Sequence, residues 1–465
     1  MKTGNLSKNT ILLAIGTFLN KGLLFVMIPI FSSWLSTEDY GRFDVYSTYA
    51  TLLIPMITLA CSEAVFRYGI EKEDIKGKSY YITNGFAVVL LNTILMTVAL
   101  LCVNSYIEWE YMVPFIFMVI GQILGNYLFG YMRCVRKLNI YSFCTAVSTV
   151  CIAVCVTLFV AVLDMALKGM IWGYAIGYIT GDVFIIIFTK FHRYISIKDI
   201  KVKGIKELLT YSYALVPNNI SWWVINVSDR EIINIVLGPT ANGIYAIACK
   251  IPNLCSALFS VFSVAWQEAA ADMVTSEKRE SYYNRIFNQM CLVLLSLCGG
   301  IVCCNFIFYK YIFEQRYYGG TAYVPILVTS ALFGSLSQYF GGIQISLKQP
   351  KANGITTMLG AVVNLTVHLV FINNVGLYAA AISTLVSNIL IVVLRAYLLR
   401  KEMQLTFEKK IFAFVGIYVY FVVVAYLEVH IIVRWINLLF SGIVFMYINR
   451  TMIQKMIRKI AKKNI

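Results

Sequence analysis

Long apolar stretches recur along almost the whole chain, and they constrain its fold more than any other feature. Most have about 20 residues, which is the length an α-helix needs to cross a hydrocarbon core about 30 Å thick. Charged residues make up 13% of the 465 positions, about half the fraction found in a soluble domain. The sequence therefore predicts an all-α polytopic membrane protein with fourteen transmembrane helices. The predicted spans are 10–34, 43–66, 80–103, 112–132, 140–163, 169–189, 208–237, 244–266, 286–309, 322–347, 354–372, 377–399, 411–427 and 435–449.

Basic residues are distributed unevenly between the two sides of this predicted topology. With the N-terminus placed in the cytoplasm, the inner segments hold 31 of the 39 lysines and arginines, and the outer loops hold five. The positive-inside rule then predicts that both termini are cytoplasmic. The net charge of +16 follows from this topology, so we predict no nucleic-acid partner.

The chain contains a weak internal repeat. Leu35-Ser-Thr-Glu-Asp-Tyr-Gly41 is echoed 202 residues later by Leu237-Gly-Pro-Thr-Ala-Asn-Gly243, and the order of six spans, basic inner loops and short outer turns also recurs. Because six is even, both copies enter the membrane the same way round, which predicts a pseudo-two-fold axis along the membrane normal and a cavity between two lobes. The predicted parts are an N-terminal six-helix lobe at 1–190, a basic cytoplasmic linker at 191–207, a second six-helix lobe at 208–400, two additional spans at 401–449 and a basic cytoplasmic tail at 450–465.

Three local patterns predict packing rather than chemistry. Every fourth residue from Gly169 to Gly181 is glycine, which favours close helix–helix contact along one face. Glu63 and Arg67 have the i, i+4 spacing of an ordinary ion pair. The twelve cysteines include no CxxC pair and no neighbouring histidine cluster, so we interpret them as buried apolar side chains without metal or disulfide roles.

Buried charges single out the stretch Leu208–Trp266. It is predicted to form two apolar helices joined by a turn at Gly238–Gly243. Arg230 and Lys250 would lie about 10 Å below the ends of these helices. Ionisable groups at such depth cost several kcal/mol unless they are paired or face water. Together with Lys21 in the first span, they are predicted substrate-binding cations, and phosphate is the anion that suits them.

Nearby acidic residues leave two interpretations open. Asp229 or Glu231 could neutralise Lys250 across the hairpin, which would give a structural pair without a substrate, and Asp229 could also hold Arg230 in place. Alternatively, these carboxylates could couple transport to an ion. Asp182, near the inner third of its span, is either a proton-coupled acid or a group that reaches the interface.

Asn219, Trp222 and Trp223 add polar and aromatic groups to the seventh span. Such groups suit a sugar-binding surface, but they also suit ordinary packing, and both interpretations stay open. The chain has no G-x-x-x-x-G-K-[ST] loop and no H-E-x-x-H sequence, so neither ATP hydrolysis nor zinc hydrolase chemistry is expected. We predict no catalytic residues and no cofactor, apart from H⁺ or Na⁺ as a coupling ion.

Several loose motifs carry a resemblance to a known family. They are Asn9 to Pro29 followed by Leu35–Gly41, Asp229-Arg230 ahead of Gly243-Ile-Tyr-Ala-Ile-Ala-Cys-Lys250, Thr321-Ala-Tyr-Val-Pro325, and Lys351-Ala-Asn-Gly354 leading to Asn364 and Gly376-Leu-Tyr-Ala-Ala-Ala-Ile382. The chain resembles bacterial polysaccharide or O-antigen flippases of the multidrug/oligosaccharidyl-lipid/polysaccharide (MOP) exporter superfamily.

The resemblance implies two lobes that open alternately to each side of the bacterial inner membrane. It also implies that undecaprenyl-pyrophosphate-linked oligosaccharide, a repeat unit of O-antigen (lipopolysaccharide) or capsule, moves from the cytoplasmic to the outer leaflet. Membrane lipid and other polysaccharide assembly proteins are the implied partners. Related flippases use cationic residues in the first helix, and Lys21 lies at a comparable depth.

We therefore expect a flippase rather than an enzyme. One alternative is a multidrug or cation antiporter of the same superfamily, but an organic-cation site should have an excess of buried carboxylates, and the deep charges here are mostly positive. The other is an intramembrane polysaccharide polymerase or acyltransferase. Such an enzyme should expose Arg, His or Glu in a large outer loop, where this chain has only Arg316.

Overall fold

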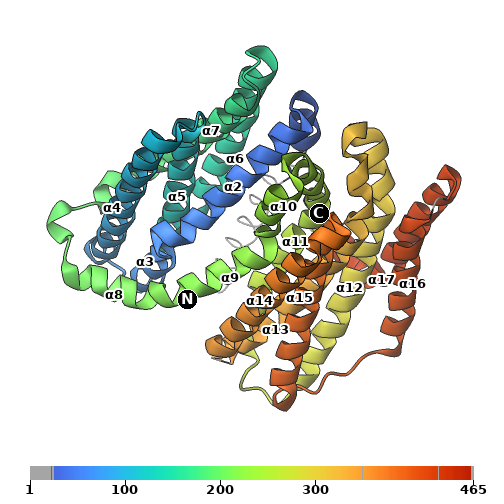
Figure 1. The fold of residues 1–465 in the computed structure, drawn as a ribbon. Helices are drawn as coiled ribbons and strands as arrows, with labels where there is room; N and C mark the ends of the chain where they lie inside the picture. The colour runs from blue at the N-terminus through green and yellow to red at the C-terminus, as the bar shows by residue number, and fades with distance from the viewer. Residues whose placement is uncertain (1–21, 24–25, 348, 428, 462–465) are drawn as a thin grey trace. The chain divides into compact units, whose positions relative to one another are not determined.

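The computed structural model describes residues 22–461 apart from 24–25, 348 and 428. Every regular element in this part of the chain is helical, so the predicted all-α fold class is confirmed (Figure 1). The chain divides into two compact units, Met1–Gly243 and Ile244–Ile465. The boundary between the two predicted lobes, at 191–207, was derived from the sequence repeat and stays a prediction. The two compact units divide later in the chain, because the helices that follow the linker pack on the first unit.

Ten helices of the described residues are long and apolar enough to cross a membrane, and one bent helix pair counts as an eleventh. The first predicted span begins outside the described residues. The predicted span 208–237 is divided among three shorter helices rather than forming one. In the first unit the helices are α2 (Thr37–Thr58), α3 (Cys61–Gly69), α4 (Ile75–Ile107), α5 (Met112–Cys134), α6 (Leu138–Val156), α7 (Ala166–Thr189), α8 (Val202–Ser212), α9 (Val216–Val227) and α10 (Asp229–Leu237).

The second unit contains most of α11 (Pro239–Asp272), within which the division falls, and six further helices. These are α12 (Arg279–Ile307), α13 (Val324–Ser346), α14 (Pro350–Val375), α15 (Leu377–Leu398), α16 (Lys409–Tyr426) and α17 (Ile431–Ala461). The basic tail predicted at 450–465 is, as far as Ala461, a continuation of α17.

The second predicted span is bent where α2 meets α3. Leu59 and Ala60 have φ angles of 47° and 53°, a left-handed conformation that costs about 1–2 kcal/mol per non-glycine residue. Pro55 lies four residues before this point, inside α2, and lacks the N–H that a regular helix would use. The two helices therefore meet at 49°. Both pack on α4 and α5, but α2 also packs on α7, α9 and α10, whereas α3 packs on α8.

The glycine stripe of α7 packs as predicted. A β-carbon built on Gly173 or Gly177 would lie 2.8 or 2.9 Å from the backbone nitrogen of Val156 or Ile152 in α6. Side chains in a well-packed interior cannot approach backbone so closely without a shift. Small residues thus allow α6 and α7 to touch backbone to backbone.

The predicted Glu63–Arg67 ion pair is wrong. Glu63 in α3 instead binds Arg133 of α5 through both carboxylate oxygens, at 2.8 and 2.9 Å, and Arg67 pairs with Glu71 one turn further along. The Arg133 guanidinium also lies 3.7 Å from the centre of the Phe66 ring. Two-point binding between helices orders Arg133 better than a single contact within one helix.

Arg395 lies inside α15 and is 1% exposed. Its guanidinium donates to neutral acceptors on two other helices, namely the carbonyl of Ser337, the carbonyl and side chain of Asn353, and the hydroxyls of Thr356 and Thr357. All three guanidinium nitrogens of Arg395 therefore have acceptors, with one at Nε, one at Nη1 and three around Nη2. This side chain therefore joins α15 to α13 and α14 within the second unit.

We predict that Gly177→Ala destabilises the protein by about 1–3 kcal/mol, the usual cost of overpacking. Gly416 in α16 is the matched control, because a β-carbon there meets nothing within 4 Å, and alanine improves helix propensity by up to about 1 kcal/mol. Thermal unfolding in detergent should show a lower midpoint for Gly177→Ala than for Gly416→Ala. Equal midpoints would mean that α6 and α7 can shift apart to accommodate the added methyl group at little cost in stability.

Candidate functional site

The two turns that the repeat makes equivalent lie against each other. A β-carbon on Gly41 would fall within 3 Å of the Pro239 carbonyl and the Gly243 nitrogen, and one on Gly243 would collide with the Thr37 carbonyl. Thr37 and Gly41 correspond to Pro239 and Gly243 at the repeat spacing of 202 residues, so the contact is reciprocal, as at an isologous interface. Asn242, fully buried, donates to the Gly41 carbonyl at 2.8 Å. Glycine at both positions permits this backbone contact.

One turn further along α2, a buried ion pair connects α2 to α10. The Arg230 Nε atom lies 2.9 Å from Asp44 Oδ2, and the two side chains are only 12% and 7% exposed. By comparison, the side chains of the Glu38–Arg42 and Arg67–Glu71 pairs are between 44% and 56% exposed. A charge as buried as that of Asp44 or Arg230 needs its partner, because removing one member of a buried pair costs about 3–5 kcal/mol.

The same region of α2 contacts the seventh predicted span at two further points. Trp223 of α9 donates its ring N–H to the Thr48 carbonyl at 3.2 Å. Tyr49 lies within hydrogen-bonding reach of Glu231 on α10. Asp44 and Thr48 are four residues apart, so they lie on one face of α2. We refer to Asp44, Thr48, Tyr49, Trp223, Arg230 and Glu231 as the α2–α10 cluster.

The break between α9 and α10 places the charged residues in this cluster. α9 ends at Val227 and α10 starts at Asp229. The Ser228 hydroxyl bonds back to the Val224 carbonyl at 2.6 Å, which competes with regular helical bonding. Asp229, 3% exposed, therefore opens α10, where the N-terminal helix dipole favours acidic side chains.

The other predicted site residues lie elsewhere or outside the described part of the chain. Lys21 is outside the described residues. Lys250 is half-buried in the second unit, on α11, and it engages another residue. Asn219 is exposed on α9 and Trp222 is half-buried. Asp182 is 5% exposed in α7, close to Gly125 of α5, and its Oδ2 has no hydrogen-bond partner among the described residues.

Asp44 is the residue that the sequence analysis missed. The Asp44 carboxylate that pairs with Arg230 comes from α2, 186 positions earlier in the chain, whereas the sequence analysis considered only acids next to Arg230. The sequence did offer a hint of this role, because Asp44 is an acidic residue just inside the N-terminal end of the apolar stretch 43–66. Around Arg230 the first unit thus has three acidic side chains, Asp44, Asp229 and Glu231, so the described charges here are not mostly positive as we expected.

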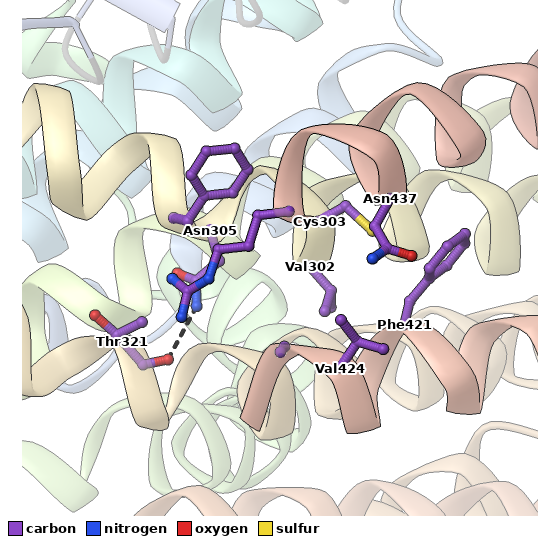
Figure 2. A pocket seen from close by; sticks show the side chains of 10 residues that line it. Val302, Cys303, Asn305, Thr321, Phe421, Val424 and Asn437 are labelled. Carbon is purple, nitrogen blue, oxygen red and sulfur yellow. Dashed lines mark hydrogen bonds between the residues drawn. The ribbon is translucent and has the colours of Figure 1, made fainter. Parts of the chain in front are cut away.

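A separate pocket lies in the second unit, lined by residues of α12, α16 and α17 and the segment before α13. Figure 2 shows Asn305, Thr321 and Asn437 beside the apolar side chains Val302 and Phe421. Asn305 donates to the Thr321 carbonyl at 3.0 Å. None of the predicted substrate residues lines this pocket.

The many apolar spans define a multi-pass membrane protein. Comparison with known families makes the assignment more specific. A family model described as "Polysaccharide biosynthesis protein" matches residues 6–267, and the chain belongs to this family.

Solved structures of similar fold include transporters from several branches of one superfamily. "Lipid II flippase MurJ, inward closed conformation" has a TM-score of 0.73 at 14% identity and covers 96% of this chain and 100% of that one. A structure of MATE in complex with MaL6 has a TM-score of 0.63 at 14% identity, covering 88% and 97%. A MOP superfamily transporter from Pyrococcus furiosus has a TM-score of 0.62 at 14% identity, covering 88% and 96%. The family match confirms the predicted resemblance to polysaccharide biosynthesis proteins, and the fold is one that a MOP superfamily transporter also has. No curated protein matches the chain.

We predict that Asp44→Ala and Arg230→Ala each destabilise the protein by about 3–5 kcal/mol, because each leaves a buried charge uncompensated. The double variant should lose less than the sum of the two, as expected for residues in direct contact. Glu38→Ala is the control, since Glu38 pairs with Arg42 on the exposed surface of α2, where such pairs are worth about 0–1 kcal/mol. Additive losses in thermal unfolding would mean that Asp44 and Arg230 do not interact.

Proposed function

We propose that this protein is a flippase that moves undecaprenyl-pyrophosphate-linked oligosaccharide, such as an O-antigen or capsule repeat unit, from the cytoplasmic to the outer leaflet of the bacterial inner membrane. The observation that carries the proposal is a fold shared along its full length with a lipid II flippase, in a chain of the polysaccharide biosynthesis family. The lipid tail can stay in hydrocarbon throughout, so the protein has to shelter only the charged and sugar-bearing head group.

Arg230 is the residue of the α2–α10 cluster best suited to the pyrophosphate. Its planar fork can bind two phosphate oxygens at once, and Asp44 holds it in place while no substrate is bound. Because three acidic side chains surround Arg230, a pyrophosphate also needs the other predicted cations, Lys21 and Lys250. Asn219, Trp222 and Trp223 are the proposed sugar contacts, and Trp223 is fixed to α2 through the Thr48 carbonyl.

The driving force proposed for transport is an H⁺ or Na⁺ gradient, coupled through Asp229, Glu231 or Asp182. Asp44 joins this set on physical grounds. If Arg230 binds phosphate, Asp44 loses its ion pair with Arg230, and uptake of a proton or a sodium ion would offset that loss. Exchange of partners at Arg230 would then link substrate binding to cation uptake.

A second candidate, cation or multidrug antiport, is favoured by one observation. Together with the adjacent Asp229, the cluster has three acidic side chains and one guanidinium, and a surplus of buried carboxylates is what a site for organic cations should have. The fold alone does not separate the two, since both kinds of transporter share it.

Reconstitution into vesicles separates the candidate functions. Fluorescent or radiolabelled lipid-linked oligosaccharide is placed in the inner leaflet, and its accessibility from outside is measured together with its mass. Movement without a change in mass is the expected result. Chain growth or acylation would instead identify a polymerase or acyltransferase. A protein that neither moves nor modifies the lipid-linked oligosaccharide, but exports cationic dyes from cells, would be an antiporter.

A charge swap tests the role of Arg230 in the flippase. Arg230→Ala should reduce flipping at least tenfold without preventing membrane insertion. The double variant Asp44→Arg/Arg230→Asp keeps an ion pair but moves the guanidinium to α2. We expect it to be more stable than either single change and yet to remain defective in flipping, measured by the same leaflet assay. Restored flipping would mean that Arg230 serves only to join α2 and α10.

A further inference from the structure

An extended segment in the second unit is bound along one face of α12. After α15 and the short helix Leu399–Lys401, residues 403–408 run without regular secondary structure to the start of α16. We call residues 402–408 the second strap. Three side chains of α12, spaced four residues apart, bind its backbone: Glu280, Asn284 and Asn288.

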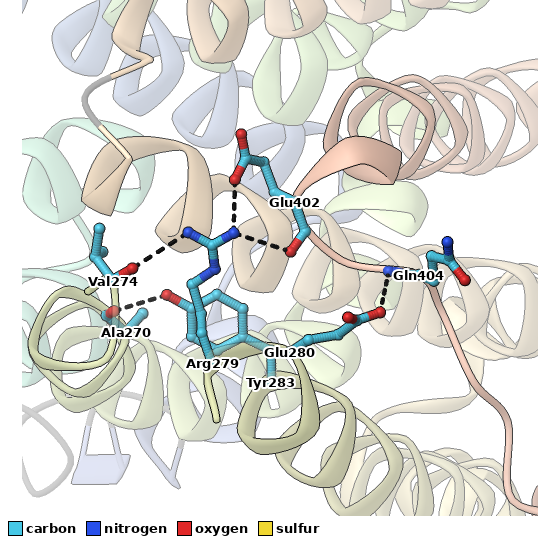
Figure 3. A network of polar contacts seen from close by, with 7 residues as sticks. All are labelled: Ala270, Val274, Arg279, Glu280, Tyr283, Glu402 and Gln404. Atoms are coloured by element: carbon cyan, nitrogen blue, oxygen red, sulfur yellow. Dashed lines mark hydrogen bonds and ion pairs between the residues drawn. The ribbon is translucent and has the colours of Figure 1, made fainter. Parts of the chain in front are cut away.

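The contacts form a regular ladder. Glu280 accepts the N–H of Gln404 at 2.9 Å. Asn284 accepts the N–H of Thr406 at 2.9 Å and donates to the Gln404 carbonyl at 2.8 Å. Asn288 repeats this pattern two residues further along the strap, with the Glu408 N–H and the Thr406 carbonyl, both at 2.8 Å. Figure 3 shows the beginning of the ladder, where Arg279 also binds Glu402.

The spacing of the ladder follows from elementary geometry. Four residues of α-helix rise about 6 Å, and two residues of extended chain rise about 6.6 Å. Side chains at every fourth position of a helix therefore stay in register with every second peptide group of an extended segment. Because the contacts go to peptide groups, the side chains of the strap itself are not part of the ladder.

The first unit contains a related set of contacts at the equivalent place. The segment that follows α7, residues 194–201, is the first strap, and two adjacent residues of α4 bind it. Its middle part, Ile197–Asp199, is a 3-10 helix, so the regular spacing of the second strap does not recur here. Thr83 accepts the Ser196 N–H and donates to the Tyr194 carbonyl, both at 3.1 Å. Asn84 accepts the Lys201 N–H at 2.8 Å and donates to the Asp199 carbonyl at 2.9 Å. Asn84 and Asn288 are 204 residues apart, close to the repeat spacing found in the sequence.

The ladder asparagines are buried and fully bonded. Asn84, Asn284 and Asn288 are 0%, 7% and 3% exposed, and each uses both its amide nitrogen and its oxygen. By contrast, Asn364 and Asn388, also in the second unit, each have an amide oxygen without a partner among the described residues. Opening a satisfied buried network is costly, because every released group loses its hydrogen bond.

We propose that Thr83 and Asn84 in the first unit, and Glu280, Asn284 and Asn288 in the second, are positioning residues for transport. In the first unit, these residues bind the segment that follows α7 to α4, and in the second unit they bind the segment that follows α15 to α12. Helices joined in this way move as one rigid body while the straps stay bound. This inference rests on the proposed function, because it assigns the ladder a role in the flippase cycle.

Proline substitution in the second strap gives a matched pair of variants. Thr406→Pro removes the N–H that Asn284 accepts, whereas Leu405→Pro removes an N–H that the ladder does not use. Both prolines suit an extended segment. Asn284→Asp is a milder variant that keeps the accepting oxygen and loses the donor. Gln404→Ala changes only a strap side chain.

The full-length protein is compared in nanodiscs by amide hydrogen exchange and in vesicles by flipping of labelled lipid-linked oligosaccharide. We expect Thr406→Pro to speed exchange of the strap and the start of α16 and to lower the turnover rate at least tenfold, with an unchanged apparent affinity for substrate. Asn284→Asp should show both effects more weakly. Leu405→Pro and Gln404→Ala should match the wild type.

Each other outcome has a definite meaning. A loosened strap with normal turnover would overturn the positioning role, as would equal effects of Thr406→Pro and Leu405→Pro. Fast exchange at Gln404, Thr406 and Glu408 in the wild type, or exchange that speeds up when substrate is added, would mean that the strap is released and not fixed. If the wild type does not flip the lipid at all, the proposed function fails, and the wild-type exchange rates alone then decide whether the strap is bound.

Discussion

Hydrocarbon offers no hydrogen bonds, so each polar group that enters the bilayer must be satisfied by the protein itself. Two buried guanidiniums meet this demand in different ways. Arg395 is surrounded by neutral acceptors on α13 and α14, which accept from all three of its nitrogens but carry no charge to offset its own. Arg230 has a carboxylate partner, Asp44, on α2. The arrangement around Arg395 suits a permanent contact between helices. In the pair of Asp44 and Arg230, a stronger anion can replace Asp44 as the partner of Arg230.

Much of the fold could be predicted, because it depends on local and periodic features. Span length follows from the thickness of the bilayer, so the apolar stretches gave the helices and the fold class directly. The glycines of α7 recur every four residues, and this periodicity alone placed them on one packed face. The echo between Leu35–Gly41 and Leu237–Gly243 marked two equivalent turns, although nothing in it indicated that the turns touch.

The interactions that the sequence did not reveal all join distant parts of the chain. Glu63 prefers Arg133, 70 residues away, to Arg67 one turn away, because binding through both oxygens between packed helices outweighs a single solvated contact. Asp44 was missed because its partner, Arg230, lies 186 positions further along the chain. The strap ladders were hidden for another reason. Their partners are peptide groups, which are the same at every position and leave no mark in the strap sequence.

The pair between Asp44 and Arg230 also limits how a substrate can act on this molecule. A ligand shifts a conformational equilibrium only by the difference in its affinity for the two states, so a phosphate has to bind Arg230 more strongly than Asp44 does. A pyrophosphate carries more than one negative charge, whereas Asp44 carries one, and it can occupy the guanidinium fork at two points. The released carboxylate then needs a cation in its place, since a lone buried charge is costly. A single exchange at Arg230 would thus connect anion binding to cation uptake without a separate coupling site.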